Sequence, residues 1–164
     1  MILEKGLNII GEFLKDEFRN ELLQQDHDAT GRHLKSISFE TTKTAGGFEL
    51  VFSSLPYGID LNNGTGGGRF VPIPALIEWI QAKGMASGDQ EMKSMAFAIR
   101  QNIYKNGTPS ESSYIRSKNG RRKEWIDFTV NKNKAIISNK LALIIGENLD
   151  IVLNNIATNI NSVL

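Results

Sequence analysis

Residues 36–52, SISFETTKTAGGFELVF, decide the fold class because they predict a pair of strands in a chain whose other periodic segments are helical. Apolar and polar residues alternate on both sides of the Ala45-Gly46-Gly47 turn, and a period of two is typical of a β-hairpin with one buried face. The side chains expected on that face are Ile37, Phe39, Phe48, Leu50 and Phe52. The predicted fold is therefore α+β, a small antiparallel sheet packed against helices.

Apolar residues spaced three and four apart predict four further elements, all helical. An N-terminal helix is expected over 2–24, a short helix over 75–83 after Pro72 and Pro74, and a third helix after a capping box at Ser87 and Gln90. The strongest stripe belongs to a long C-terminal helix and comprises Ile137, Leu141, Ile145, Leu149, Val152, Ile156, Ile160 and Val163. We expect the helices beginning near Ile2 and Ala75 to pack on the sheet, with the C-terminal helix on one flank.

The length of 164 residues suits one domain, which we divide into a core over 31–109, a basic loop region over 110–133 and the C-terminal helix over 134–164. Residues 110–120 are polar and are expected to form a loop, whereas 125–130 fit either a strand or a helix. The net charge is only +1. There is no cysteine, and this excludes disulfides, thiolate metal sites and a cysteine nucleophile. We expect no signal peptide, because the first residues show no basic region followed by an apolar block. We expect no membrane span, because no apolar run approaches the roughly 20 residues that a spanning helix needs.

A glycine-rich segment from Asn62 to Gly84 suggests a phosphate-binding loop at first sight. A P-loop requires Lys and Ser/Thr at the start of a helix, but here Arg69-Phe70-Val71-Pro72 follows the glycines. We therefore interpret this segment as an arm that touches a neighbouring subunit. The expected interface residues are Asn63, Gly64, Thr65, Gly66, Gly67, Gly68 and Arg69.

A segment rich in Lys and Arg, residues 116–134, precedes the expected C-terminal helix. Tyr114 and Trp125 flank it, and aromatic rings beside cations are typical of nucleic-acid-binding surfaces. Contact with an acidic surface of a partner subunit is the interpretation that we favour, with a nucleic-acid-binding module as the alternative. The cations expected to contact a partner or DNA are Arg116, Lys118, Arg121, Arg122 and Lys123.

No combination of residues predicts an enzyme or a cofactor site. The segment 26–31 copies the start of a calcium loop, but its last ligand position falls on Ile37, so capping of a helical turn by Asp28 or Thr30 is the preferred interpretation. The two histidines, His27 and His33, have no nucleophile motif beside them. A metal-dependent hydrolase built on Asp26, Asp28 or Glu40 is a third hypothesis.

In their order along the chain, these features resemble the tail-completion and head–tail joining proteins of tailed bacteriophages, also called neck or minor tail proteins. The resemblance covers residues 29–109, about half the chain. Its collinear pieces are ATGRHLKSI (29–37), the hairpin, Tyr57-Gly58, Asn63-Gly64-Thr65-Gly66, the Pro-x-Pro helix LIEWIQAKG (76–84), AFAIR (96–100) and Gly107-Thr108-Pro109.

The resemblance implies a structural virion protein that is made in the bacterial cytoplasm and assembled into the neck or tail. It implies a homo-oligomeric ring, six- or twelve-fold, around the DNA passage, where it joins the tail to the head or completes it. The implied partners are portal, neck and tail proteins, with possible contact to DNA in the channel, and neither cofactor nor turnover is implied.

Overall fold

The fold is α+β, with a two-stranded antiparallel sheet and several helices. It is described from a computed structural model that covers the backbone of residues 2–161 and the side chains of residues 3–154. In chain order the elements are α1 (Ile2–Gln24), α2 (Arg32–Ser36), β1 (Ser38–Thr44), β2 (Gly47–Ser53), α3 (Tyr57–Asn63), α4 (Ile73–Ala82), α5 (Asp89–Asn106), a 3-10 helix η1 (Glu111–Arg116) and α6 (Trp125–Asn161).

The hairpin has the predicted orientation. Phe39 lies opposite Phe52 and Thr41 opposite Leu50, so the apolar side chains of both strands share one face. That face packs on α1, where the ring of Phe18 meets the ring of Phe52 edge-on with centroids 5.2 Å apart. Gly11 permits this close approach, since a Cβ built there would lie 2.3 Å from the Phe39 ring.

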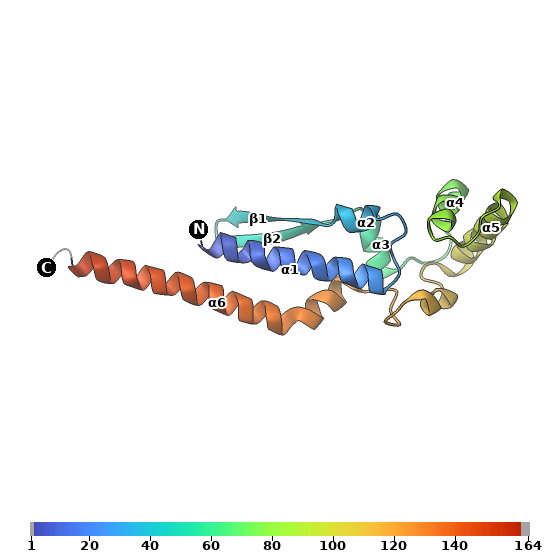
Figure 1. Cartoon of the computed structure of the whole chain (residues 1–164). Helices are drawn as coiled ribbons and strands as arrows, with labels where there is room; N and C mark the ends of the chain where they lie inside the picture. Colours follow the sequence, from blue (N-terminus) through green and yellow to red (C-terminus); the bar gives the residue numbers. More distant parts are fainter. Residues whose placement is uncertain (1, 162–164) are drawn as a thin grey trace.

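The main hydrophobic core, which we call the first core, joins α1, the hairpin and α6. Phe18 of α1 contacts both the hairpin and α6, because its ring also meets the indole of Trp125 edge-on, with centroids 5.5 Å apart. The buried apolar members are Ile10, Leu14, Phe18, Leu22, Ile37 and Trp125. Figure 1 shows the resulting long layer, with α6 running beside α1 and the hairpin on the other side of α1.

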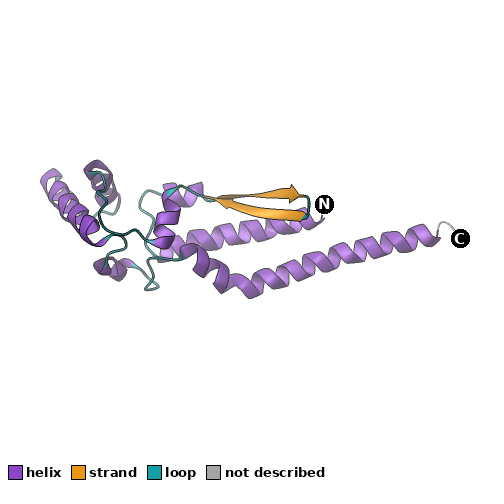
Figure 2. Ribbon diagram, turned by 180° about the vertical axis from the view of Figure 1, so that it is seen from behind, coloured by secondary structure: helices purple, strands orange, loops and turns teal. Residues whose placement is uncertain are grey.

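A second core lies at one end of this layer and is built by α4 and α5. Its buried members are Leu76, Ile80, Met92 and Ala96. The expectation that the helix near Ala75 packs on the sheet is therefore wrong. The apolar stripe of α4 is covered by the next helix in sequence, and α1 already covers the apolar face of the hairpin. The two cores are separate clusters, and both views of the molecule show the α4–α5 pair standing apart from the hairpin (Figures 1 and 2).

Three local predictions are also corrected, and one helix was missed. The C-terminal helix begins at Trp125 rather than at residue 134, so 125–130 is helical, and η1 occupies part of the expected loop at 110–120. Helix α3 was not predicted. The capping box is absent, because Gly88 is the N-cap of α5 and no side chain caps that end.

The early start of α6 has a tertiary cause. The Asn62 side-chain carbonyl accepts a hydrogen bond from the Ile126 N–H at 2.9 Å, and the Asn62 backbone carbonyl accepts one from the Glu124 N–H at 2.7 Å. The indole of Trp125 is buried in the first core and donates to the Gly58 carbonyl at 2.9 Å. Helix α3 therefore supplies the cap and the anchor for the first turn of α6.

Candidate functional site

The candidate site is a polar cluster at the C-terminal end of α1, where three distant segments meet; we call it the junction and define it as residues 25–28, Lys83 and Arg122. The last carbonyl groups of a helix lack intrahelical partners and carry partial negative charge. Here the guanidinium of Arg122 donates to the Gln25 carbonyl at 2.6 Å and to the Asp26 carbonyl at 3.2 Å. The basic segment therefore supplies the cap of α1.

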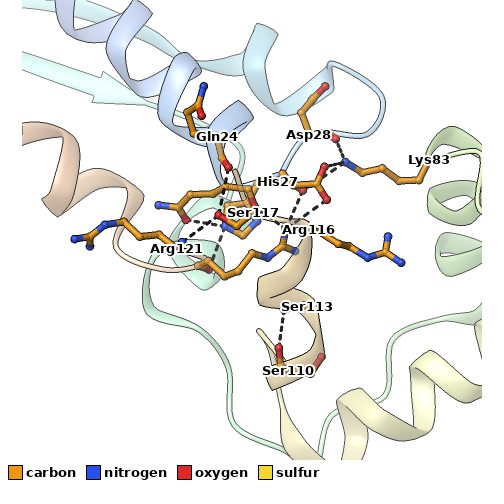
Figure 3. A network of polar contacts seen from close by, with 12 residues as sticks. Gln24, His27, Asp28, Lys83, Ser110, Ser113, Arg116, Ser117 and Arg121 are labelled. Carbon is orange, nitrogen blue, oxygen red and sulfur yellow. Dashed lines mark hydrogen bonds and ion pairs between the residues drawn. The ribbon is translucent and has the colours of Figure 1, made fainter. Parts of the chain in front are cut away.

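Lys83, the C-cap residue of α4, reaches the same place from the second core. Its ammonium group lies 2.6 Å from a carboxylate oxygen of Asp26 and also donates to the backbone carbonyl of Asp28. The Arg122 guanidinium is 3.5 Å from the other carboxylate oxygen of Asp26. One carboxylate thus joins α4 to the basic segment, and the two cationic side chains are only 14% and 11% exposed. Figure 3 shows Lys83 extending from α4 toward the loop that follows α1.

His27 completes the junction as a neutral hydrogen-bond donor. Its Nε2 lies 3.1 Å from both the Arg122 backbone carbonyl and the Gln25 side-chain oxygen. Gln25 uses its own amide N–H groups on Glu21 and on the Lys123 carbonyl, so its oxygen is free to accept from His27. Burial and the nearby Arg122 charge lower the pKa of His27 from 6.5 to about 4.

His33 lies beyond the junction, buried between the rings of Tyr57 and Trp125 at centroid distances of 4.9 and 5.6 Å. Burial lowers its pKa, and neither ring nitrogen has a hydrogen-bond partner in the structure. A catalytic histidine would need a hydrogen bond to a nucleophile and another to an orienting group. Neither histidine has that arrangement, and no group of acidic and histidine side chains within the described residues is placed to hold a metal ion.

A groove of about 850 Å³ opens beside the junction, between the end of the first core and the second core. Asp28, His33 and Tyr57 line one wall, and the apolar side chains of Trp79 and Ile103 line the other. An ion pair between Arg32 of α2 and Glu78 of α4 spans the two walls. The arrangement of the second core against the rest of the chain therefore rests largely on polar contacts.

The glycine-rich segment is attached to the end of α5. Thr65 and Thr108 exchange two backbone hydrogen bonds, of 2.7 and 2.9 Å, and their hydroxyl groups lie 2.7 Å apart. The Gly68 N–H donates to the Tyr104 carbonyl at 2.7 Å. The exposed members of the predicted interface are Asn63, Gly66, Gly67, Gly68 and Arg69, and Gly64 and Thr65 are half-buried.

The five predicted cations of the basic segment are not gathered on one surface. Arg122 is used at the junction, the Arg121 guanidinium lies 3.9 Å over the Phe128 ring, and the Arg116 guanidinium lies 5.5 Å over the Trp79 ring. Lys118 and Lys123 are exposed. The three arginines thus pack against this chain, at the end of α1, on α6 and on α4.

Sequence reasoning selected Arg122 but missed its partner carbonyl groups and missed Lys83 altogether. The partner of Lys83 lies 57 residues away, so no local pattern points to it. A basic residue at the end of a helix does not by itself predict a distant partner, because the cation is also stabilised by the carbonyl groups of its own last turn.

Comparison of the chain with protein-family models, with curated proteins and with solved structures gave no match. In the part of the chain that the structure describes, no helix is both long enough and apolar enough to span a membrane.

Proposed function

We propose that this chain is a structural virion protein of a tailed bacteriophage, a subunit of the ring that joins or completes the tail at the neck. Two lines of support are independent of each other. The order of sequence features over 29–109 resembles that family. The chain is elongated and leaves large apolar side chains exposed, which neighbouring subunits could cover.

The observation that carries the proposal is the amount of large apolar side chain left on the surface of an elongated chain. On α6, Ile145 is 51% exposed, Leu149 57% and Leu153 61%, and these residues follow one another at steps of four along the helix surface. Contiguous exposed apolar surface marks sites of association more often than free surface. Head-to-tail contacts between such surfaces form a ring when the rotation closes.

Nucleic-acid binding by the segment 116–134 is the second candidate, and the internal contacts of its arginines favour the structural role. A surface that binds phosphate by charge needs several free cations along one track. Arg116, Arg121 and Arg122 each contact a group of this chain instead. Lys118, Lys123 and Lys134 are exposed cations of the segment through which contact with DNA in a channel would be made.

Negative-stain microscopy and light scattering test the ring, on the chain alone and mixed with the portal, neck and tail proteins of its phage. We expect closed rings or a ring-bearing tail in at least one of these mixtures. A monomer in every mixture contradicts the proposal.

A salt series on duplex and single-stranded DNA separates the two candidates. The double variant Lys118→Glu, Lys123→Glu reverses the charge of two exposed cations and leaves the Arg122 side chain at the end of α1 in place, whereas Arg122→Glu would disturb the fold. Binding that is tight, falls steeply with salt and is lost in the double variant would favour the nucleic-acid module. We expect weak binding in both chains.

A further inference from the structure

Helix α6 is longer than the surface that the rest of the chain offers it. It has 37 residues against 23 in α1, and at about 1.5 Å per residue the two helices are roughly 55 and 35 Å long. They run antiparallel, because Trp125 packs on Phe18 and Ile144 lies against Gly6 near the start of α1. The C-terminal part of α6 projects past the start of α1 and the tip of the hairpin (Figure 1).

The apolar stripe of α6 leaves the first core at this point. Leu141 packs against that core, and so does Ile144, which lies on a neighbouring face of the helix. The next three members of the stripe, Ile145, Leu149 and Val152, are 51%, 57% and 53% exposed. The regular apolar pattern of the sequence therefore continues on a face that the chain itself does not cover.

The apolar residues of the stripe are spaced regularly enough for a second helix to pack along them. From Leu141 the steps are four, four, three, four, four and three residues, an eleven-residue repeat that runs through Leu141, Ile145, Leu149, Val152, Ile156, Ile160 and Val163. Such a repeat keeps an apolar seam on one side of a nearly straight helix and allows it to pack along another helix. Three members of this seam have described and exposed side chains.

The charges of this part of the helix argue for a second copy as the occupant. From residue 141 to the end there is no Lys or Arg, and the charged residues are Glu147 and Asp150. At 100° per residue, both acids lie at least about 130° from the middle of the exposed stripe. Two copies can therefore join their stripes without opposing like charges, whereas nucleic acid and anionic lipid would find no cation.

We propose that Ile145, Leu149 and Val152 form a helix–helix interface with the same stripe of a second copy, with the two α6 helices parallel. This inference rests on the ring of the proposed function: copies related by rotation about one axis point in the same direction along it, so stripes that face this axis meet those of the neighbouring copies at the same level. It adds the surface through which the copies are held together, at the end of the molecule away from α4 and α5.

The test compares two leucines of the same helix. Leu149 lies on the stripe, and Leu143 lies about 120° around the helix and is 69% exposed. Sedimentation velocity over a concentration series is run on the full chain, on Leu149→Asp and on Leu143→Asp. We expect wild type and Leu143→Asp to associate alike and Leu149→Asp to dissociate at least ten times more readily, with circular dichroism confirming equal helix content.

The absence of cysteine allows a direct measurement of proximity. In parallel helices the two copies of position 149 lie at the same level, so Leu149→Cys should form a disulfide-linked dimer under mild oxidation. Leu143→Cys, on the opposite side, should form far less.

Three other outcomes would contradict this interface. Association that is equal in wild type and Leu149→Asp overturns this interface and leaves the ring proposal standing. A wild-type chain that stays monomeric also overturns the interface, while microscopy of the mixtures judges the ring by itself. Loss of binding to a tail protein in Leu149→Asp, with self-association unchanged, assigns the stripe to that protein instead.

Discussion

At the scale of single residues, Asp26 holds together segments that the sequence separates widely. Its carboxylate contacts Lys83 and Arg122, whose own donors also satisfy carbonyl groups at the end of α1. Since both cationic side chains are largely buried, removal of the carboxylate would leave two charges without compensation. The aspartate that resembled the first ligand of a calcium loop is thus part of an internal ion-pair cluster.

His27 gives the junction a dependence on pH. Its pKa is lowered from 6.5 to about 4, so it is neutral in the folded chain and takes up a proton more readily when unfolded. Its contribution to stability is complete above pH 6.5 and is lost as the pH falls toward 4. We predict that wild type loses up to about 3 kcal/mol more unfolding free energy over this interval than His27→Gln.

Urea unfolding at several pH values measures this difference. The carboxylates and His33 are present in both chains, so their effects cancel in the comparison. Identical pH profiles would show that His27 is not held neutral by the fold.

The glycine-rich segment offers a second test at single positions. A Cβ on Gly67 would lie 2.8 Å from the backbone oxygens of Tyr104 and Lys105, whereas one on Gly66 meets nothing within 4 Å. We predict that Gly67→Ala lowers the unfolding free energy by about 1–3 kcal/mol and that Gly66→Ala changes it by less than about 0.5 kcal/mol. Urea midpoints check both values. Equal midpoints for the two variants would contradict the close contact with α5, and Gly66 is the position at which assembly can be probed without disturbing the fold.

At the scale of elements, α4 and α5 form a helix pair whose placement depends on polar contacts. The Lys83 ammonium group is the contact that joins α4 to the end of α1. Lys83→Met keeps most of the aliphatic chain and removes that charge. We predict that amide hydrogens of α4 exchange about ten times faster in this variant, while those of α1 next to the hairpin are unchanged.

Hydrogen exchange followed by mass spectrometry measures the effect, with Lys93→Met as the control because Lys93 is an exposed lysine of α5. Equal protection of α4 in both variants would mean that Arg32 and Glu78, with the threonine pair, are sufficient to hold the second core in place.

At the scale of the whole molecule, two separate cores predict two levels of stability. Among the described residues, the second core has four buried apolar side chains and draws them from two helices. The first core draws on α1, the hairpin segment and α6. We predict that α5 amides exchange through local opening at a lower free energy than α1 amides, as native-state exchange in increasing urea would reveal. A single free energy for all helices would show that the junction couples the cores fully.

The sequence alone determined the elements whose signals are local. The hairpin over 36–52, the helix over 2–24 and the helices in α4 and α5 follow from apolar spacing, because one buried face imposes a period of two on a strand and about 3.6 on a helix. The same spacing revealed the stripe of α6. The clustering of basic residues over 116–134 indicated Arg116, Arg121 and Arg122 as residues of interest, without their partners.

Only the tertiary structure decided where α6 begins, which surface α4 covers and what the basic segment contacts. Asn62 caps α6 from a helix that has no clear local signal, and Lys83 and Arg122 meet Asp26 across gaps of 57 and 96 residues. A cap or an ion pair depends on the distance between groups in space, and hydrophobic periodicity records only which side of an element is buried. The stripe on α6 illustrates the division: its spacing is set by the sequence, and its exposure beyond Ile144 is set by where α1 and the hairpin end.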